Sequence, residues 1–106
     1  MGYQLFEPAC LGPLQLKNRT IRSATNEHVS EPDGQPTLEW VRILTELAEH
    51  EVGLVISGHM TVDRTQRAAE GQIVLDRQTD RSLLIQAADR VHQAGGRLLA
   101  QISHSG

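Results

Sequence analysis

Two polar side chains, Gln101 and His104, are the first candidates for chemistry in this sequence. They lie in and after the apolar run RLLAQIS, which follows Gly95-Gly96 and is typical of a β-strand. The Gln101 amide carries a hydrogen-bond donor beside an acceptor, so it could bind a planar ligand edge or only satisfy loop backbone. His104 could act as an acid or base, as histidine side chains often do near neutral pH, but a structural role is the simpler interpretation.

Two further segments combine small and polar residues at the ends of predicted strands. The first is Ser23, Ala24, Thr25 and Asn26, at the end of a strand predicted from about Asn18 to Ser23. The second is Gly58 and His59, after the apolar run VGLVISG, which is too short for a helix and rich in β-branched residues. Small residues let backbone groups approach a ligand closely, and glycine does so most easily. Ordinary strand-to-loop transitions would have the same composition.

Helices are predicted between these strands. Thr37 is a plausible N-cap for a helix that runs to about His50, and Thr79 or Asp80 could cap a second helix, which Gly95-Gly96 ends. Each helix has an apolar stripe at helical spacing. The stripes are Leu38, Val41, Leu44, Leu47 and Ala48 in the first helix, and Leu84, Ala87, Ala88 and Val91 in the second. A short hairpin is predicted around Gly12-Pro13.

The order of these elements, strand–helix–strand–helix–strand, predicts an α/β fold with right-handed crossovers between parallel strands. A doubly wound sheet and the beginning of a (β/α)8 barrel both fit this order. A dinucleotide-binding sheet should carry G-x-G-x-x-G at its first strand-to-helix turn. That turn reads SATNEHVSEPDGQPT, which is long and polar and has no such motif. Barrel active sites are built from loops of this kind, so the barrel is favoured.

Composition excludes several classes of protein. With aromatic residues at 3% and a net charge of −3, the chain has neither a stacking platform nor a basic patch, which argues against nucleic-acid partners. The single Cys10 cannot form an internal disulfide or a multi-thiolate metal site, so no metal site is predicted. No apolar run is long enough to cross a membrane and no signal-type N-terminus is present, which predicts a cytoplasmic protein without a membrane partner.

Four segments in order resemble the N-terminal third of the old yellow enzyme family. They are LFEPACLGPLQLKNRTIRSAT, DGQPT, VGLVISGHMTV and HQAGGRLLAQISHSG. Each motif is weak alone, but the four keep the family's order and spacing. The resemblance implies a (β/α)8 TIM barrel that binds FMN, takes reducing equivalents from NAD(P)H and passes hydride through the flavin to an activated alkene or a related small-molecule acceptor.

The resemblance also implies roles for the candidate residues. Gln101 corresponds to the glutamine that reads the pyrimidine edge of the flavin, and Ser23, Ala24 and Thr25 to the segment beneath the isoalloxazine ring. Relatives place a threonine or cysteine that tunes the flavin near Thr25 or Asn26, so either residue, or neither, has that role here. Gly58 and His59 are expected to contact the flavin, with the His59 ring pointing elsewhere.

The resemblance covers essentially the whole chain, from about Leu5 to Gly106, but a complete barrel needs roughly 200 residues or more. Residues 1–106 are therefore expected to be an N-terminal fragment of an FMN-binding barrel, inactive alone and completed by the remaining barrel segment. No catalytic residue is assigned within it. The alternative is a non-catalytic module whose open strand edges bind another copy or a complementary fragment.

Overall fold

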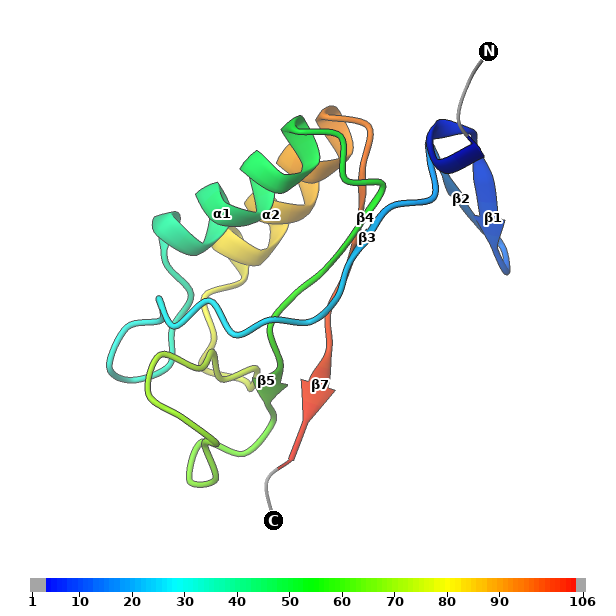
Figure 1. The fold of residues 1–106 in the computed structure, drawn as a ribbon. Helices are drawn as coiled ribbons and strands as arrows, with labels where there is room; N and C mark the ends of the chain where they lie inside the picture. Colours follow the sequence, from blue (N-terminus) through cyan, green and yellow to red (C-terminus); the bar gives the residue numbers. More distant parts are fainter. Residues whose placement is uncertain (1–3, 105–106) are drawn as a thin grey trace.

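The computed structural model describes residues 4–104 and has two helices packed on one face of a parallel sheet (Figure 1). The sheet has the strand order β3-β4-β6, with Ile21 opposite Leu54 and Leu54 opposite Arg97. Its elements are β3 (Ile21–Arg22), α1 (Leu38–Glu49), β4 (Leu54–Ile56), α2 (Arg81–Gln93) and β6 (Arg97–Leu99). The predicted α/β class is confirmed. Within residues 4–104 the sheet is open and does not close into a barrel.

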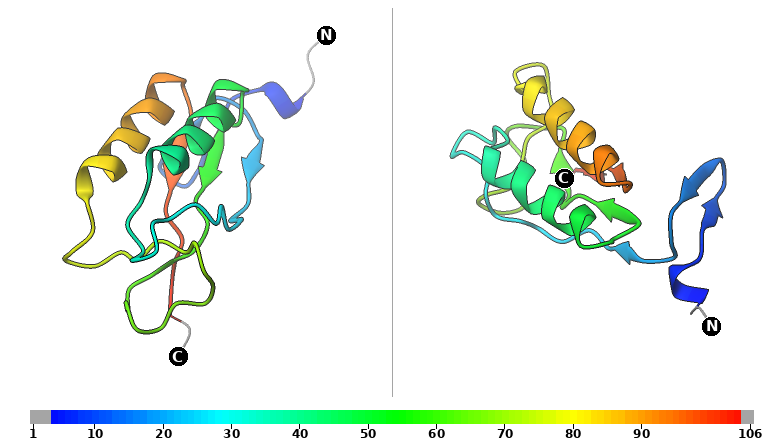
Figure 2. Two further views of the ribbon diagram at one scale, coloured as in Figure 1. Left: turned by 90° about the vertical axis from the view of Figure 1, so that its left-hand side faces the viewer. Right: turned by 90° about the horizontal axis from the view of Figure 1, so that it is seen from above.

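The predicted hairpin is present and extends from one end of the molecule (Figure 2). It follows a short 3-10 helix (Gln4–Phe6) and pairs β1 (Ala9–Leu11) with β2 (Leu14–Leu16) in antiparallel register. The turn between the two strands contains Gly12 at φ 58°, in the left-handed region that glycine enters without a steric penalty.

The first sheet strand is shorter than the predicted Asn18–Ser23, because a side-chain turn occupies its beginning. The Asn18 side chain is buried, and its Oδ1 accepts hydrogen bonds from the backbone N–H and the hydroxyl of Thr20, at 3.0 and 2.8 Å. Its Nδ2 donates to the Glu51 carbonyl at 2.7 Å. Such a local side-chain bond bends the backbone and competes with extended pairing. Regular pairing therefore begins only at Ile21.

Both helices begin at their predicted caps. The Thr37 hydroxyl accepts a hydrogen bond from the Trp40 N–H at 3.1 Å, and Asp80 accepts one from the Ser82 N–H at 2.9 Å. Of the two candidates for the second cap, Asp80 is therefore correct. Thr79 instead donates from its hydroxyl to the Val74 carbonyl, within the loop before the helix. Neither helix is long and apolar enough to cross a bilayer.

The core lies between the helices and the sheet, where the two predicted stripes meet. Val55 of β4 is fully buried against residues of both helices. Burial of such side chains contributes about 1.5–3 kcal/mol each. The buried cluster is Trp40, Val41, Leu44, Ala48, Val55, Met60, Ile73, Ala87 and Val91. On the opposite face of the sheet, Ile21 and Leu99 are 51% and 44% exposed.

The predicted third strand, RLLAQIS, is interrupted by a β-bulge in its partner. β5 (Met60–Thr61) continues the course of β4, and β7 (Ile102–Ser103) continues that of β6. Three residues, 57–59, separate Ile56 from Met60, whereas only two, 100–101, separate their partners Leu99 and Ile102. Bulges of this kind bend the strand and redirect side chains, often beside functional sites.

Candidate functional site at the strand ends

The structure brings the predicted residues of three separate segments to one edge of the sheet. Since Ile21, Leu54 and Arg97 lie opposite one another in parallel strands, counting four residues onward along each chain leads to Thr25, Gly58 and Gln101. Close packing supports this placement near Gly58, since a Cβ added there would lie 2.6 Å from the Thr25 carbonyl oxygen.

The segment of Gln101 is joined to the same edge by two hydrogen bonds. Its N–H lies 3.3 Å from the Ser57 hydroxyl, and its carbonyl accepts a hydrogen bond from the Met60 N–H at 2.9 Å. The Gln101 side chain is exposed, and no partner for its amide is found within residues 4–104. Its donor and acceptor are therefore open to a ligand.

Exposure alternates along the chain that leaves β3. Ile21, Ser23 and Thr25 are exposed, whereas Arg22 and Ala24 between them are partly buried. This alternation is that of an extended chain with one covered face and one open face. Thr25 uses its hydroxyl locally, donating to the Ser23 carbonyl at 3.1 Å. Small residues on the open face leave the backbone accessible to a flat ligand.

Gly58 is glycine because the neighbouring chain fills the space that a side chain would need. A Cβ there would lie 2.6 Å from the Thr25 carbonyl oxygen, 2.7 Å from Glu27 Oε1 and 2.9 Å from Asn26 Cα. Gly58 is buried, and its N–H donates to Glu27 Oε2 at 2.9 Å. The close approach expected at this glycine is thus made by the chain's own residues 25–27.

An ion pair that the motif analysis did not single out lies behind this segment. Arg22 Nη1 is 2.8 Å from Glu27 Oε2, and the two side chains are only 15% and 6% exposed. The guanidinium also donates to the carbonyls of Ile56 and Thr25, at 2.7 and 3.0 Å. The signal in the sequence was a charged residue at position 22, inside a predicted strand. Buried charges of this kind require a partner, so Arg22 implied one.

Asn26 and His28 shape the loop that follows. The Asn26 side-chain oxygen accepts a hydrogen bond from the His28 N–H at 2.9 Å, and His28 has φ 56°, an uncommon conformation for a residue other than glycine. The His28 ring is held by the Glu70 carbonyl, 3.2 Å from Nδ1. Asn26 thus has a structural use in the loop, whatever it contacts beyond it.

The His59 side chain contacts β7. Its Nδ1 lies 3.2 Å from the Ser103 hydroxyl, and its carbonyl accepts a hydrogen bond from Gln72 at 3.2 Å. With its carbonyl and its ring both bonded to protein groups, His59 has less to offer a ligand than Gln101.

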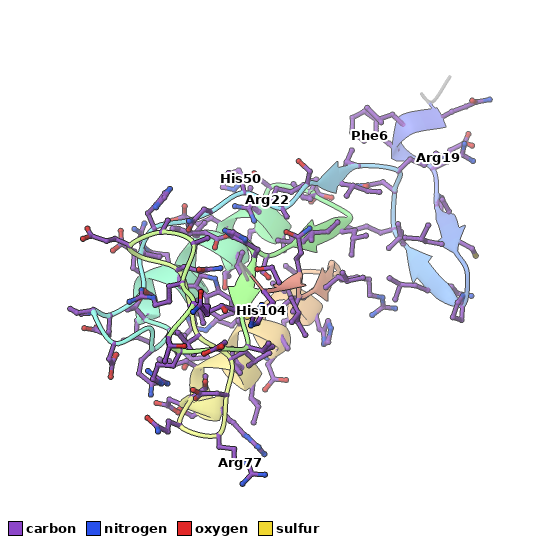
Figure 3. All side chains as sticks on the ribbon, turned by 90° about the horizontal axis from the view of Figure 1, so that it is seen from below. Phe6, Arg19, Arg22, His50, Arg77 and His104 are labelled. Atoms are coloured by element: carbon purple, nitrogen blue, oxygen red, sulfur yellow. The ribbon has the colours of Figure 1, made fainter. Side chains whose placement is uncertain are left out.

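His104 lies beside a carboxylate. Its Nε2 is 3.4 Å from Asp63 Oδ2. Hydrogen bonds from the Thr65 side chain and backbone, with a smaller contribution from His104, lower the pKa of Asp63. The contact agrees with the structural role favoured for this histidine. Figure 3 shows His104 well away from Phe6 and Arg19, which lie on either side of the hairpin in the sequence.

This set of groups fits the polar edge of a flavin. An amide donor beside an amide acceptor, as in Gln101, complements the N3–H and carbonyl oxygens of the flavin pyrimidine ring. Residues 23–25 have small side chains and two of them are exposed, so a flat ring could lie along this segment without large side chains intervening. The chain is an α/β protein with such groups at the carboxyl ends of its parallel strands, and barrel enzymes bind their ligands at that end.

Comparison with known proteins identifies the family. The profile of the NADH:flavin oxidoreductase / NADH oxidase family matches residues 4–106, so the chain belongs to that family. It is 34% identical over 104 residues to 4,4'-dithiodibutanoate disulfide reductase from Rhodococcus erythropolis. That match covers 96% of this chain and 25% of the relative, so the chain spans about a quarter of its length.

Comparison with solved structures agrees with this family assignment. Morphinone reductase in complex with tetrahydroNAD superposes with a TM-score of 0.81 at 26% identity, over 99% of this chain and 28% of the enzyme. The old yellow enzyme homologue from Zymomonas mobilis also has a TM-score of 0.81, over 96% of this chain and 28% of that chain, and at 22% identity it shows the fold alone. The neighbours are TIM-barrel enzymes of the old yellow enzyme family, which confirms the predicted resemblance and favours the barrel over the doubly wound sheet.

Proposed function

We propose that residues 1–106 form one wall of an FMN site in an oxidoreductase that takes hydride from NAD(P)H and delivers it to an activated alkene or a related small-molecule acceptor. The observation that carries this proposal is the meeting of Thr25, Gly58 and Gln101 at one sheet edge, with the Gln101 amide exposed and free of protein partners within residues 4–104. Family membership supports the cofactor class.

The work of this wall is to bind and orient the cofactor. FMN, when bound, supplies the hydride chemistry, and the protein provides position and polarity. Gln101 would bind the pyrimidine edge, while Ser23, Ala24 and Thr25 would lie along one face of the ring. Asn26, Gly58 and His59 would border the same ring, with Gly58 acting through its backbone. We assign no proton transfer to any of these residues, so the catalytic groups remain to be found outside this set.

Other features support the remaining parts of the proposal. Morphinone reductase binds tetrahydroNAD, which agrees with a nicotinamide reductant here. The open sheet edges at β3 and β6 agree with completion by further barrel strands, since unpaired edges recruit partners. We place the protein in the cytoplasm because reduced nicotinamide is available there.

The test is binding of FMN to the purified protein. We expect a yellow protein whose FMN fluorescence is quenched on binding. Gln101→Ala should raise the Kd for FMN about tenfold, since each lost hydrogen bond contributes about 0.5–1.5 kcal/mol. Gln93→Ala, an exposed glutamine at the end of α2, is the matched control and should bind FMN normally. A protein that stays colourless after incubation with FMN would refute the assignment.

A second candidate function is a non-catalytic module that binds another copy of itself or a complementary barrel fragment. The observation that favours it is the exposure of Ile21 and Leu99 on the open face, at 51% and 44%, together with that of Ile102 in β7, at 57%. Gel filtration separates the two functions. A flavin-free oligomer of residues 1–106 would support the module, whereas FMN binding by the protein supports the oxidoreductase.

A further inference from the structure

The Arg22–Glu27 ion pair makes hydrogen bonds to the backbone of three residues in and beside the candidate site, Thr25, Ile56 and Gly58. Arg22 binds the Glu27 carboxylate, the Thr25 carbonyl of its own segment and the Ile56 carbonyl of β4. Glu27 Oε2 in turn accepts the N–H of Gly58 at 2.9 Å. These bonds connect the chain leaving β3 to the chain leaving β4, on either side of the contact between Thr25 and Gly58.

The pair lies behind the proposed flavin face. Arg22 alternates with the exposed residues Ile21 and Ser23, so its side chain extends to the opposite side of the extended chain. With side chains 15% and 6% exposed, Arg22 and Glu27 are covered by protein. The pair therefore acts on a ligand only through the backbone that it holds.

Stability alone is a poor explanation for this pair. Two buried charges lose most of their hydration, and replacing such a pair by apolar side chains of similar size is often neutral or stabilising. Loss of one partner is different, because it leaves the other charge buried and unpaired. The guanidinium offers several fixed N–H groups at once, which lets it reach two carbonyls and a carboxylate in one geometry. That geometry is what an apolar replacement would lose.

We propose that the Arg22–Glu27 pair is a positioning device, which sets the backbone of Ser23–Asn26 against FMN and so controls the affinity and the electronic environment of the flavin. This inference rests on the proposed FMN site. It assigns a role to two residues that do not touch the cofactor, and it predicts that FMN binding and protein stability respond differently to their replacement.

The experiment compares single and double variants of the FMN-loaded full-length protein. Glu27→Leu and Arg22→Met should each weaken FMN binding about tenfold, by analogy with the loss seen when the outer hydrogen-bond partners of metal ligands are removed. Both should also shift the visible flavin spectrum. The double variant Arg22→Met/Glu27→Leu should recover stability toward wild type, because no charge is left unpaired. It should still bind FMN weakly, with a shifted spectrum.

Conservative variants sharpen the test. Arg22→Lys keeps the charge but replaces the planar fork, so FMN binding should remain weak. Glu27→Gln keeps an oxygen that can accept a hydrogen bond from the Gly58 N–H, so the Kd of this variant for FMN should stay within about threefold of wild type. If only the charges mattered, Arg22→Lys would bind FMN normally and Glu27→Gln would bind it weakly.

The matched control is the Arg64–Asp76 pair, whose side chains are 29% and 23% exposed and whose contacts lie in the loops before α1 and α2. Asp76→Asn should change stability and leave the flavin spectrum unchanged. A wild type that binds no FMN refutes the proposed function, and this inference with it. If wild type binds FMN but the double variant has the same Kd and spectrum, the positioning role alone is overturned. The double variant decides the matter even where a single variant does not fold.

Discussion

Replacement of Gly58 by alanine tests the central contact of the site. The added Cβ would lie 2.6 Å from the Thr25 carbonyl oxygen and 2.9 Å from Asn26 Cα, and both are backbone atoms that no side-chain rotation can move. Ordinary contact begins near 3.4 Å. The segment around Thr25 must therefore retreat by roughly 0.5–0.8 Å, as the steep repulsion between atoms in van der Waals contact requires.

Such overpacking costs about 1–3 kcal/mol of unfolding free energy. The displacement also disturbs the bond from the Gly58 N–H to Glu27, because the Cβ would lie 2.7 Å from the other carboxylate oxygen of Glu27. We therefore expect Gly58→Ala to lower stability in urea unfolding followed by circular dichroism. FMN titration should show weaker binding, since the proposed flavin-facing segment has moved.

Gly12→Ala is the matched control, because it introduces backbone strain at a position where an added Cβ meets no other atom. Gly12 has φ 58° and no heavy atom within 4 Å of an added Cβ. Its replacement should cost about 1–2 kcal/mol through the left-handed conformation alone. FMN binding should stay normal, because the hairpin lies at the far end from the site. If Gly58→Ala leaves both stability and FMN binding unchanged, the packing argument for this glycine is wrong.

Two further predictions concern the scaffold. Arg64 lowers the pKa of Asp76, chiefly through their side-chain hydrogen bond. The resulting stabilisation is present above the ordinary aspartate pKa of 3.8 and is lost as the pH falls through the lowered pKa. In urea unfolding across acid pH, the unfolding free energy of Asp76→Asn should therefore depend less on pH than that of wild type. Thr37→Ala removes the acceptor for the Trp40 N–H at the start of α1 and should lower the unfolding free energy by about 1–2 kcal/mol, measured in urea at neutral pH, whereas unchanged stability would contradict the capping role.

The elements of this protein that depend on nearby residues could be predicted from the sequence. Helix α1 is capped by Thr37 and ends next to His50, as its cap and apolar spacing indicate, because capping and helical periodicity act over a few residues. The hairpin at Gly12 follows from a turn signal of the same short range. The order of strands and helices also placed Thr25, Gly58 and Gln101 at one edge, since parallel strands end on the same side.

Contacts between distant segments could not be predicted in this way. The Asn18 side chain reaches the Glu51 carbonyl, and Gly58 is confined by residues 25–27, which lie more than thirty positions earlier in the sequence. The bulge between β4 and β5 becomes visible only when the two strands are paired with β6 and β7.

The sequence by itself determined the element order, the helix caps and the family of this protein, because these depend on residue type and local spacing. Only the tertiary structure decided what holds the candidate site together. Arg22 and Glu27 are five residues apart, but their partners Ile56 and Gly58 belong to another strand. A charged residue in a predicted buried strand indicates that it needs a partner, but only the tertiary structure shows which groups are its partners.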